Sequence, residues 1–195
     1  DPEITPLVPV LKSYWLMLHV AVITASYGFF GMSFLLGLTS MVMMNVRNRA
    51  NLSVWNLRIE ELRIINELSL TIGLCLLTAG TFLGAFWANE SWGRYWGWDP
   101  KETWALITMI VYALVLHARF IPKLRGDFAF SVMSVFALTS VLMTYFGVNY
   151  YLAGLHSYGK GDTPPALDII YLVYGLIILF TCWTAWRNRR LSDVE

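Results

Sequence analysis

The sequence is short of charge. Asp, Glu, Lys and Arg make up 14% of its 195 residues, and the formal net charge is +1. Hydrophobic residues make up 57%, and the mean hydropathy is +0.55. Soluble domains carry about 25% charged residues, so this composition excludes an ordinary soluble domain and is typical of a protein that crosses a membrane several times. The sequence has no basic run of the kind that binds nucleic acid, and we expect no nucleic-acid partner.

Cysteine is almost absent. Cys75 and Cys182 stand far apart inside apolar runs, and we expect both to be small buried side chains. The sequence contains neither a Cys-x-x-Cys pair nor a Cys-x-x-Cys-His motif. These absences exclude a thiol oxidoreductase, and they exclude a protein that carries covalently attached c-type haem of its own.

Long apolar runs are abundant, and they predict about five transmembrane helices. The first run, 14–44, would be ~46 Å long as a helix, which exceeds the ~30 Å hydrocarbon core of a bilayer. Residues 57–68 place apolar side chains at near-helical spacing between charged ones, which predicts an interfacial helix leading into the second span. The fold class is therefore an all-α polytopic membrane protein, with 1–195 as a single membrane domain. The predicted spans are 14–44, 68–86, 104–120, 128–148 and 167–186.

The placement of Lys and Arg predicts the orientation of these spans. Ten of the fourteen lie on the side that holds 45–67, 119–127 and 187–195. Because positive charge accumulates on the cytoplasmic side of membrane proteins, we expect that side to be cytoplasmic. The N-terminus is then outside, the C-terminus is cytoplasmic, and the loops 87–103 and 149–165 are both external.

The stretch 87–104 concentrates tryptophan, with five of the nine in the chain. An interfacial aromatic belt would spread such residues over many helix ends. Their concentration favours a stacking platform for a large planar cofactor, and we expect that cofactor to be haem. Asp99 precedes Pro100 and is expected to cap the third helix. Arg94 and Lys101 are either partners for haem propionates or solvated loop charges.

The predicted topology places two of the three histidines beside this loop. His19 lies near the outer end of the first span, and His156 lies in the other external loop. Two imidazoles on opposite sides of one iron would form a bis-histidine haem site, whereas two unrelated interfacial histidines are the alternative. His117 lies thirteen residues beyond Trp104, so it is roughly 20 Å deeper along the third span. It is either a functional intramembrane residue or a polar contact between helices.

Residues 92–104, Trp-Gly-Arg-Tyr-Trp-Gly-Trp-Asp-Pro-Lys-Glu-Thr-Trp, resemble the tryptophan-rich WWD signature of haem-handling membrane proteins. The continuation from Asp99 is similar to the cytochrome c synthesis family CcsA, also called ResC, which occurs alone or as the C-terminal half of the fused synthase CcsBA. Three further stretches agree with this family in order. They are 15–20 (Trp-Leu-Met-Leu-His-Val), 115–119 (Val-Leu-His-Ala-Arg) and 154–159 (Gly-Leu-His-Ser-Tyr-Gly).

The resemblance implies a role for each matching residue. His19 and His156 would be the catalytic pair that ligates haem iron at an external attachment site. His117 would ligate iron within the membrane, with a second axial ligand supplied by an N-terminal CcsB-type half or subunit. The cofactor-binding set that the resemblance implies is His19, His156, His117, Trp92, Trp96, Trp98, Asp99, Trp104 and Arg94.

The activity that the resemblance implies is that of a cytochrome c haem lyase, or holocytochrome c synthase. Its substrate and ligand would be haem b, which is exported and joined by thioether bonds to the Cys-x-x-Cys-His motif of apocytochrome c. The location would be the bacterial inner membrane, with the thylakoid membrane as an alternative. Family members have further spans upstream, and the chain starts at Asp1 without a signal peptide, so we expect it to be the C-terminal portion of a longer protein.

Two other functions stay open at this point. One is a haem exporter or chaperone that delivers haem without attaching it, since binding and attachment need the same site. The other is a b-type electron-transfer subunit. It is less favoured because such proteins usually set histidine pairs on facing helices within the bilayer, whereas two histidines here lie at one surface.

Overall fold

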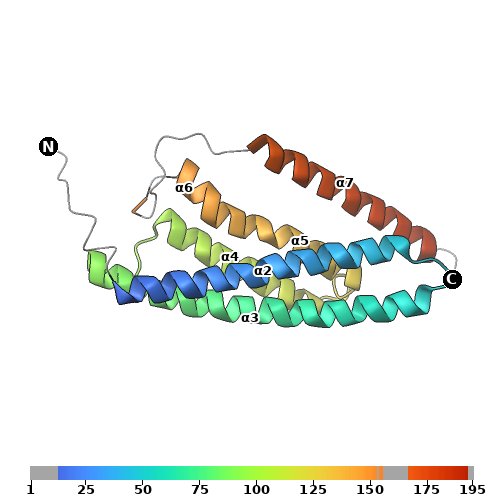
Figure 1. Cartoon of the computed structure of the whole chain (residues 1–195), viewed down its shortest axis with the longest axis horizontal. Helices are drawn as coiled ribbons and strands as arrows, with labels where there is room; N and C mark the ends of the chain where they lie inside the picture. Colours follow the sequence, from blue (N-terminus) through green and yellow to red (C-terminus); the bar gives the residue numbers. More distant parts are fainter. Residues whose placement is uncertain (1–12, 153, 156–166, 193–195) are drawn as a thin grey trace.

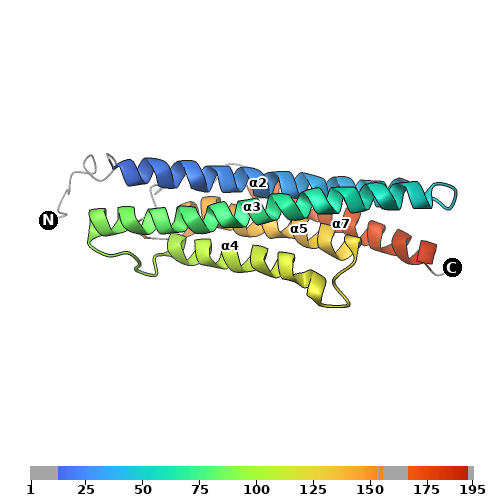
Figure 2. The same ribbon diagram turned by 90° about the horizontal axis from the view of Figure 1, so that it is seen from below.

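The structure is a computed structural model that describes residues 13–152, 154–155 and 167–192. Five long helices run along one common direction (Figures 1 and 2). They are α2 (Tyr14–Val46), α3 (Leu52–Trp92), α4 (Pro100–His117), α5 (Asp127–Leu142) and α7 (Leu167–Ser192). Three short turns join or extend them: the 3₁₀ turn η1 (Ala118–Phe120), the π turn η2 (Met143–Gly147) and α6 (Val148–Tyr151).

Among the described residues, five helices are long and apolar enough to cross a membrane, which confirms the predicted all-α class with about five candidate spans. α2 and α3 lie side by side along most of their length (Figures 1 and 2). α5 packs against α2, and α4 packs against α3 and α5. Many large apolar side chains point away from the bundle, among them Leu35, Leu114 and Leu179, as suits helices surrounded by lipid. Cys75 and Cys182 are also exposed, so the expectation that they are buried is wrong. Each helix buries only a narrow stripe, and both cysteines lie outside it.

α3 differs from the prediction, because it is one helix of 41 residues, ~62 Å long. The pattern of apolar and charged residues instead predicts an interfacial helix, a separate span and the start of the tryptophan loop in the same stretch. Nothing interrupts the helix before Gly93, whose left-handed φ of 71° ends it. Trp87 and Trp92 are therefore helical, and the loop itself is only 93–99. We call the end of the bundle that carries this loop the loop end.

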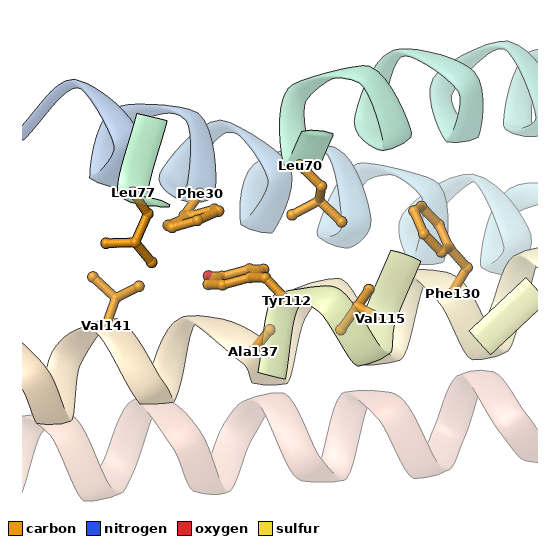
Figure 3. Packing of buried hydrophobic residues seen from close by; sticks show 8 residues of the cluster. All are labelled: Phe30, Leu70, Leu77, Tyr112, Val115, Phe130, Ala137 and Val141. Atoms are coloured by element: carbon orange, nitrogen blue, oxygen red, sulfur yellow. The ribbon is translucent and has the colours of Figure 1, made fainter. Parts of the chain in front are cut away.

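Small residues allow the helices to approach closely. A methyl group at Gly37 of α2 would lie 2.9 Å from the Ser131 carbonyl oxygen of α5, and one at Gly73 of α3 would lie 2.7 Å from the Phe30 ring. Close approach at small residues is the usual way in which helices associate within a bilayer. The Phe30 ring in turn stacks on Tyr112 of α4, with ring centroids 3.6 Å apart (Figure 3). The core cluster comprises Phe30, Leu70, Leu77, Tyr112, Val115, Phe130, Ala137 and Val141.

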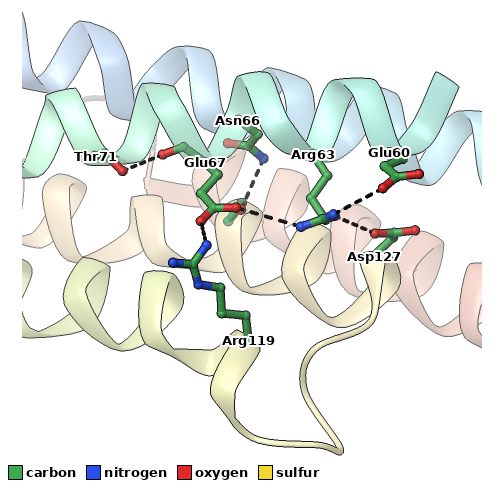
Figure 4. A network of polar contacts seen from close by, with 8 residues as sticks. Glu60, Arg63, Asn66, Glu67, Thr71, Arg119 and Asp127 are labelled. Atoms are coloured by element: carbon green, nitrogen blue, oxygen red, sulfur yellow. Dashed lines mark hydrogen bonds and ion pairs between the residues drawn. The ribbon is translucent and has the colours of Figure 1, made fainter. Parts of the chain in front are cut away.

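Charged side chains join three helices toward the other end of the bundle (Figure 4). Arg63 of α3 pairs with Asp127 at the start of α5, at 2.9 Å, and Glu67 of α3 pairs with Arg119 of η1. Arg63 also lies near Glu60 and Glu67. Two charged residues of 57–68, Arg63 and Glu67, are thus paired with other elements of the bundle, whereas Arg58 and Glu61 pair with each other on α3.

Candidate functional site

A cavity of about 520 Å³ lies at the loop end. This volume is within the range of about 300–1,000 Å³ that is usual for sites that bind small molecules and cofactors. Its walls come from α2, α3, α4, the loop, the end of α5 and the π turn η2. The α2 wall is a stripe at helical spacing, which consists of Leu16, His19, Val20, Ile23, Thr24 and Tyr27.

His19 is held on this wall by the backbone of α3. Its Nδ1 lies 2.7 Å from the Gly80 carbonyl oxygen. A carbonyl only accepts hydrogen bonds, so this contact requires the proton on Nδ1, and Nε2 carries the lone pair of the neutral ring. A histidine that binds a metal usually donates its other ring N–H in this way. The ring itself lies on Gly84, where a methyl group would be 2.6 Å from Cε1 of His19.

The tryptophan loop forms a shared wall between this cavity and a second one. Tyr95 and Trp96 line both cavities. The second, of about 510 Å³, lies between α3 and α4 and is lined almost entirely by apolar side chains, including Trp98. Trp98 adopts φ 57°, a left-handed conformation that is costly for a bulky residue and is usually kept only where the surroundings enforce it. It meets Trp96 edge to face, with centroids 5.7 Å apart.

The capping role predicted for Asp99 is confirmed. One side-chain oxygen accepts the Lys101 N–H at 3.0 Å, and Glu102 in return accepts the Asp99 N–H at 3.2 Å. This capping box satisfies backbone donors at the start of α4. Glu102 also accepts the Gly97 N–H at 2.7 Å, so one carboxylate holds both the loop and the helix. Lys101 and Glu102 are the charged side chains on the described cavity wall.

Four other residues predicted to bind the cofactor lie in the loop or at the helix ends that flank it. Within the described ranges, neither cavity is lined by Trp92, Arg94, Asp99 or Trp104. Trp92 packs edge to face on Trp87, at 4.7 Å between centroids, and the backbone oxygen of Trp104 accepts from the Thr108 hydroxyl at 2.8 Å. Arg94 folds over the loop, 3.5 Å from the Gly97 carbonyl oxygen.

The other two predicted histidines are not part of the described cavity. His156 lies outside the described residues. His117 is the last residue of α4, at the far end of that helix from the loop. It is exposed on the same face as Ile110 and Leu114, and its Nδ1 lies 2.7 Å from the Ala113 carbonyl oxygen. His19 and His117 therefore belong to separate regions, as the sequence predicts.

Several residues that line the cavity are not among those predicted from the sequence. Tyr27 lies eight residues after His19, and this spacing places both on one face of α2, so helical periodicity was a usable signal. Thr144, Tyr145 and Phe146 line the cavity from the π turn, where three consecutive side chains contribute to one wall. π turns often mark functional sites, but nothing in the sequence indicates this one.

Comparison with known proteins identifies the group to which this site belongs. Residues 1–156 match the family described as cytochrome c assembly protein. The chain belongs to the cytochrome c assembly protein family. Membership confirms the family that the sequence resembles. The family match covers α2 to α6, and hence all of the described wall of the cavity.

Individual members of this assembly family are also similar to the chain. It is 56% identical over 165 residues to Protein NrfI of Wolinella succinogenes. The aligned stretch covers 85% of this chain and 18% of NrfI. It is 40% identical over 173 residues to the cytochrome c biogenesis protein CcsA of Guillardia theta, covering 79% of this chain and 57% of CcsA. CcsA of Synechococcus sp. (strain CC9902) is 38% identical over 178 residues. The chain thus spans a fifth or less of NrfI and under two thirds of the CcsA relatives.

Proposed function

We propose that the chain handles haem b and takes part in its covalent attachment to apocytochrome c at the outer face of the membrane. The observation that carries the proposal is the loop-end cavity, where the imidazole of His19 faces the same space as Tyr95 and Trp96. An apolar cavity with one imidazole and flat aromatic walls suits a porphyrin with a ligated iron. Family membership supports haem as the molecule handled, because cytochrome c assembly requires it.

In this proposal, His19 and His156 ligate the haem iron from its two sides. His19 supports the assignment, because a ring N–H donated to a backbone carbonyl, as Nδ1 donates to Gly80, is typical of a histidine that binds a metal. Trp96 and Trp98 orient the ring from the loop, and Trp92 packs on Trp87, which also lines the cavity. Lys101, on the cavity wall, is placed to pair with a propionate, and Arg94 is the second candidate for that role.

The reaction at this site needs positioning more than acid–base catalysis. Each cysteine S–H of the apocytochrome Cys-x-x-Cys-His motif adds across one haem vinyl group, forming one C–S bond and one C–H bond. The addition is redox-neutral and consumes no oxidant. The protein's contribution is to hold the vinyl edge toward the incoming thiols, while axial ligation keeps the iron reduced. The motif histidine then displaces His19 or His156 from the iron and releases the product.

We infer that His117 serves an earlier step, in which haem crosses the membrane. Its exposed position on α4 supports ligation together with a residue from outside this chain, in an N-terminal CcsB-type half or subunit. The charge distribution supports placing the loop end outside, because ten of the fourteen Lys and Arg residues flank the opposite ends of the helices. The location that follows is the bacterial inner membrane, with the thylakoid membrane as the alternative.

The test supplies the complete protein, including any sequence upstream of this chain, with reduced haem and a Cys-x-x-Cys-His peptide. The expected product is a haem–peptide thioether adduct, which is identified by its shifted absorption and by its mass. A matched Ser-x-x-Ser-His peptide should give no adduct. Haem that binds without forming an adduct would favour an exporter, and a protein that binds no haem would contradict the whole proposal.

A further inference from the structure

Asp99 joins two segments that are 56 residues apart. One of its carboxylate oxygens, Oδ1, accepts the Lys101 N–H at 3.0 Å and so caps α4. The other, Oδ2, accepts the backbone N–H of Leu155 at 2.7 Å. The residue is buried, with 7% of its surface exposed. Both oxygens are thus engaged by backbone donors, and each bond is a charge-assisted one of the stronger kind.

Lys101, two residues after Asp99, holds a residue six positions before Leu155. Its Nζ donates to Oδ1 of Asn149 in α6, at 3.1 Å. Gly154 lies directly against the same turn, because a methyl group there would be 2.9 Å from Cδ of Pro100 and would collide with the Asp99 carboxylate. Asn149 and Leu155 are therefore both fastened to the first turn of α4, and the residue that follows Leu155 in the chain is His156.

We propose that Asp99 is a positioning residue, which fixes Leu155 on the first turn of α4 and thereby constrains the chain directly before His156. This inference rests on the proposed function of His156 as a haem ligand. It reassigns Asp99 from contact with the cofactor to a role behind the wall, since within the described residues the carboxylate lines neither cavity. In this proposal, Asp99 and Lys101 of the tryptophan motif hold the chain that precedes His156, while the tryptophans of the motif contact the haem ring.

The two oxygens of Asp99 make its two roles separable. Serine is as good a helix cap as aspartate, because its single oxygen accepts one N–H of the first turn. It is too short, and has too few acceptors, to reach Leu155 as well. Asp99→Ser should therefore keep α4 capped and release Leu155. Asparagine is the less clean choice, because its amide would present an N–H group to one of the two backbone donors.

The direct test is hydrogen exchange in the complete protein, comparing wild type with Asp99→Ser. Amides in 149–155 should exchange at least about tenfold faster in the variant, which is the effect of losing one charge-assisted hydrogen bond. Amides in 103–108 of α4 are the internal control and should keep their wild-type rates. Unchanged exchange in 149–155 would overturn the positioning role, whatever happens to haem.

The second readout is the haem absorption spectrum with and without added imidazole. Asp99→Ser should lose haem about tenfold or more, as His156→Gly does, and imidazole should restore the low-spin spectrum in both. Restoration in His156→Gly but not in Asp99→Ser would overturn positioning in favour of a general structural defect. If His156→Gly retains haem while exchange in 149–155 is faster in Asp99→Ser, the proposed ligation by His156 is the part that fails.

Discussion

At the scale of single residues, the position and tautomer of the His19 ring are set by its contacts with two glycines of α3. The Gly80 carbonyl oxygen fixes the tautomer, and Gly84 one turn later leaves room for the imidazole against α3. Gly80 and Gly84 have the small-xxx-small spacing that lets membrane helices pack closely, and Ile23 occupies the same groove beside Gly80. The position of the proposed iron ligand therefore depends on the absence of two methyl groups on a neighbouring helix.

Gly84→Ala tests this dependence. The added methyl would lie 2.6 Å from Cε1 of His19, so the imidazole must move, and we expect about a tenfold loss of retained haem. Spectroscopic titration of haem into the purified complete protein measures the effect. Gly31→Ala in α2 is the matched control, because a methyl there meets nothing within 4 Å and should leave haem retention unchanged. Equal haem affinity in the two variants would mean that the His19 ring is not held by Gly84.

The sequence indicated two residues of the cavity wall, but it indicated neither their contacts nor most of the wall. The tryptophan cluster and the predicted topology brought His19 and Trp96 together, and both line the same cavity. The hydrogen bond from His19 to Gly80 was not predictable from either helix alone, because it depends on the register between α2 and α3. Which loop residues line a cavity also depends on how the short loop folds, including the left-handed conformation of Trp98.

At the scale of helices, local signals succeeded where they were strong. Asp99 followed by Pro100 predicted the start of α4, and the capping box confirms it. Tryptophan density predicts a loop from residue 87, whereas α3 continues to Trp92 and ends at Gly93. The charged part of α3 is continuous with the rest of the helix, and its Arg63 and Glu67 pair with residues of other elements.

Glu67→Gln tests whether these pairs stabilise the bundle. Glu67 is 23% exposed and contacts both Arg63 and Arg119, so we expect the variant to lose about 1 kcal/mol of unfolding free energy, the upper part of the range for partly exposed pairs. Thermal unfolding in detergent micelles measures it. The control is Arg58→Gln, which removes an ion pair confined to one exposed helix face and should change little. If the two variants melt alike, the pairs between helices contribute no more than a surface pair.

At the scale of the whole molecule, the two ends of the bundle have different characters. The loop end carries the cavity, the aromatic wall and His19, and the opposite end carries the ion pairs among α3, η1 and α5 (Figures 1 and 4). His117 lies on α4 away from the loop, which is consistent with two separate haem positions along one transport path. The five spans follow from apolar length alone, while the orientation of the bundle in the membrane stays a prediction from its charges.

The central claim is that His19 ligates haem iron in the loop-end cavity. The most direct measurement is the absorption spectrum of the complete protein with His19→Gly, recorded with and without imidazole. The account predicts that the variant folds, loses the low-spin haem spectrum and cytochrome c maturation, and regains part of both when imidazole fills the space left by the side chain. A folded His19→Gly protein that keeps the wild-type haem spectrum without imidazole would contradict the account.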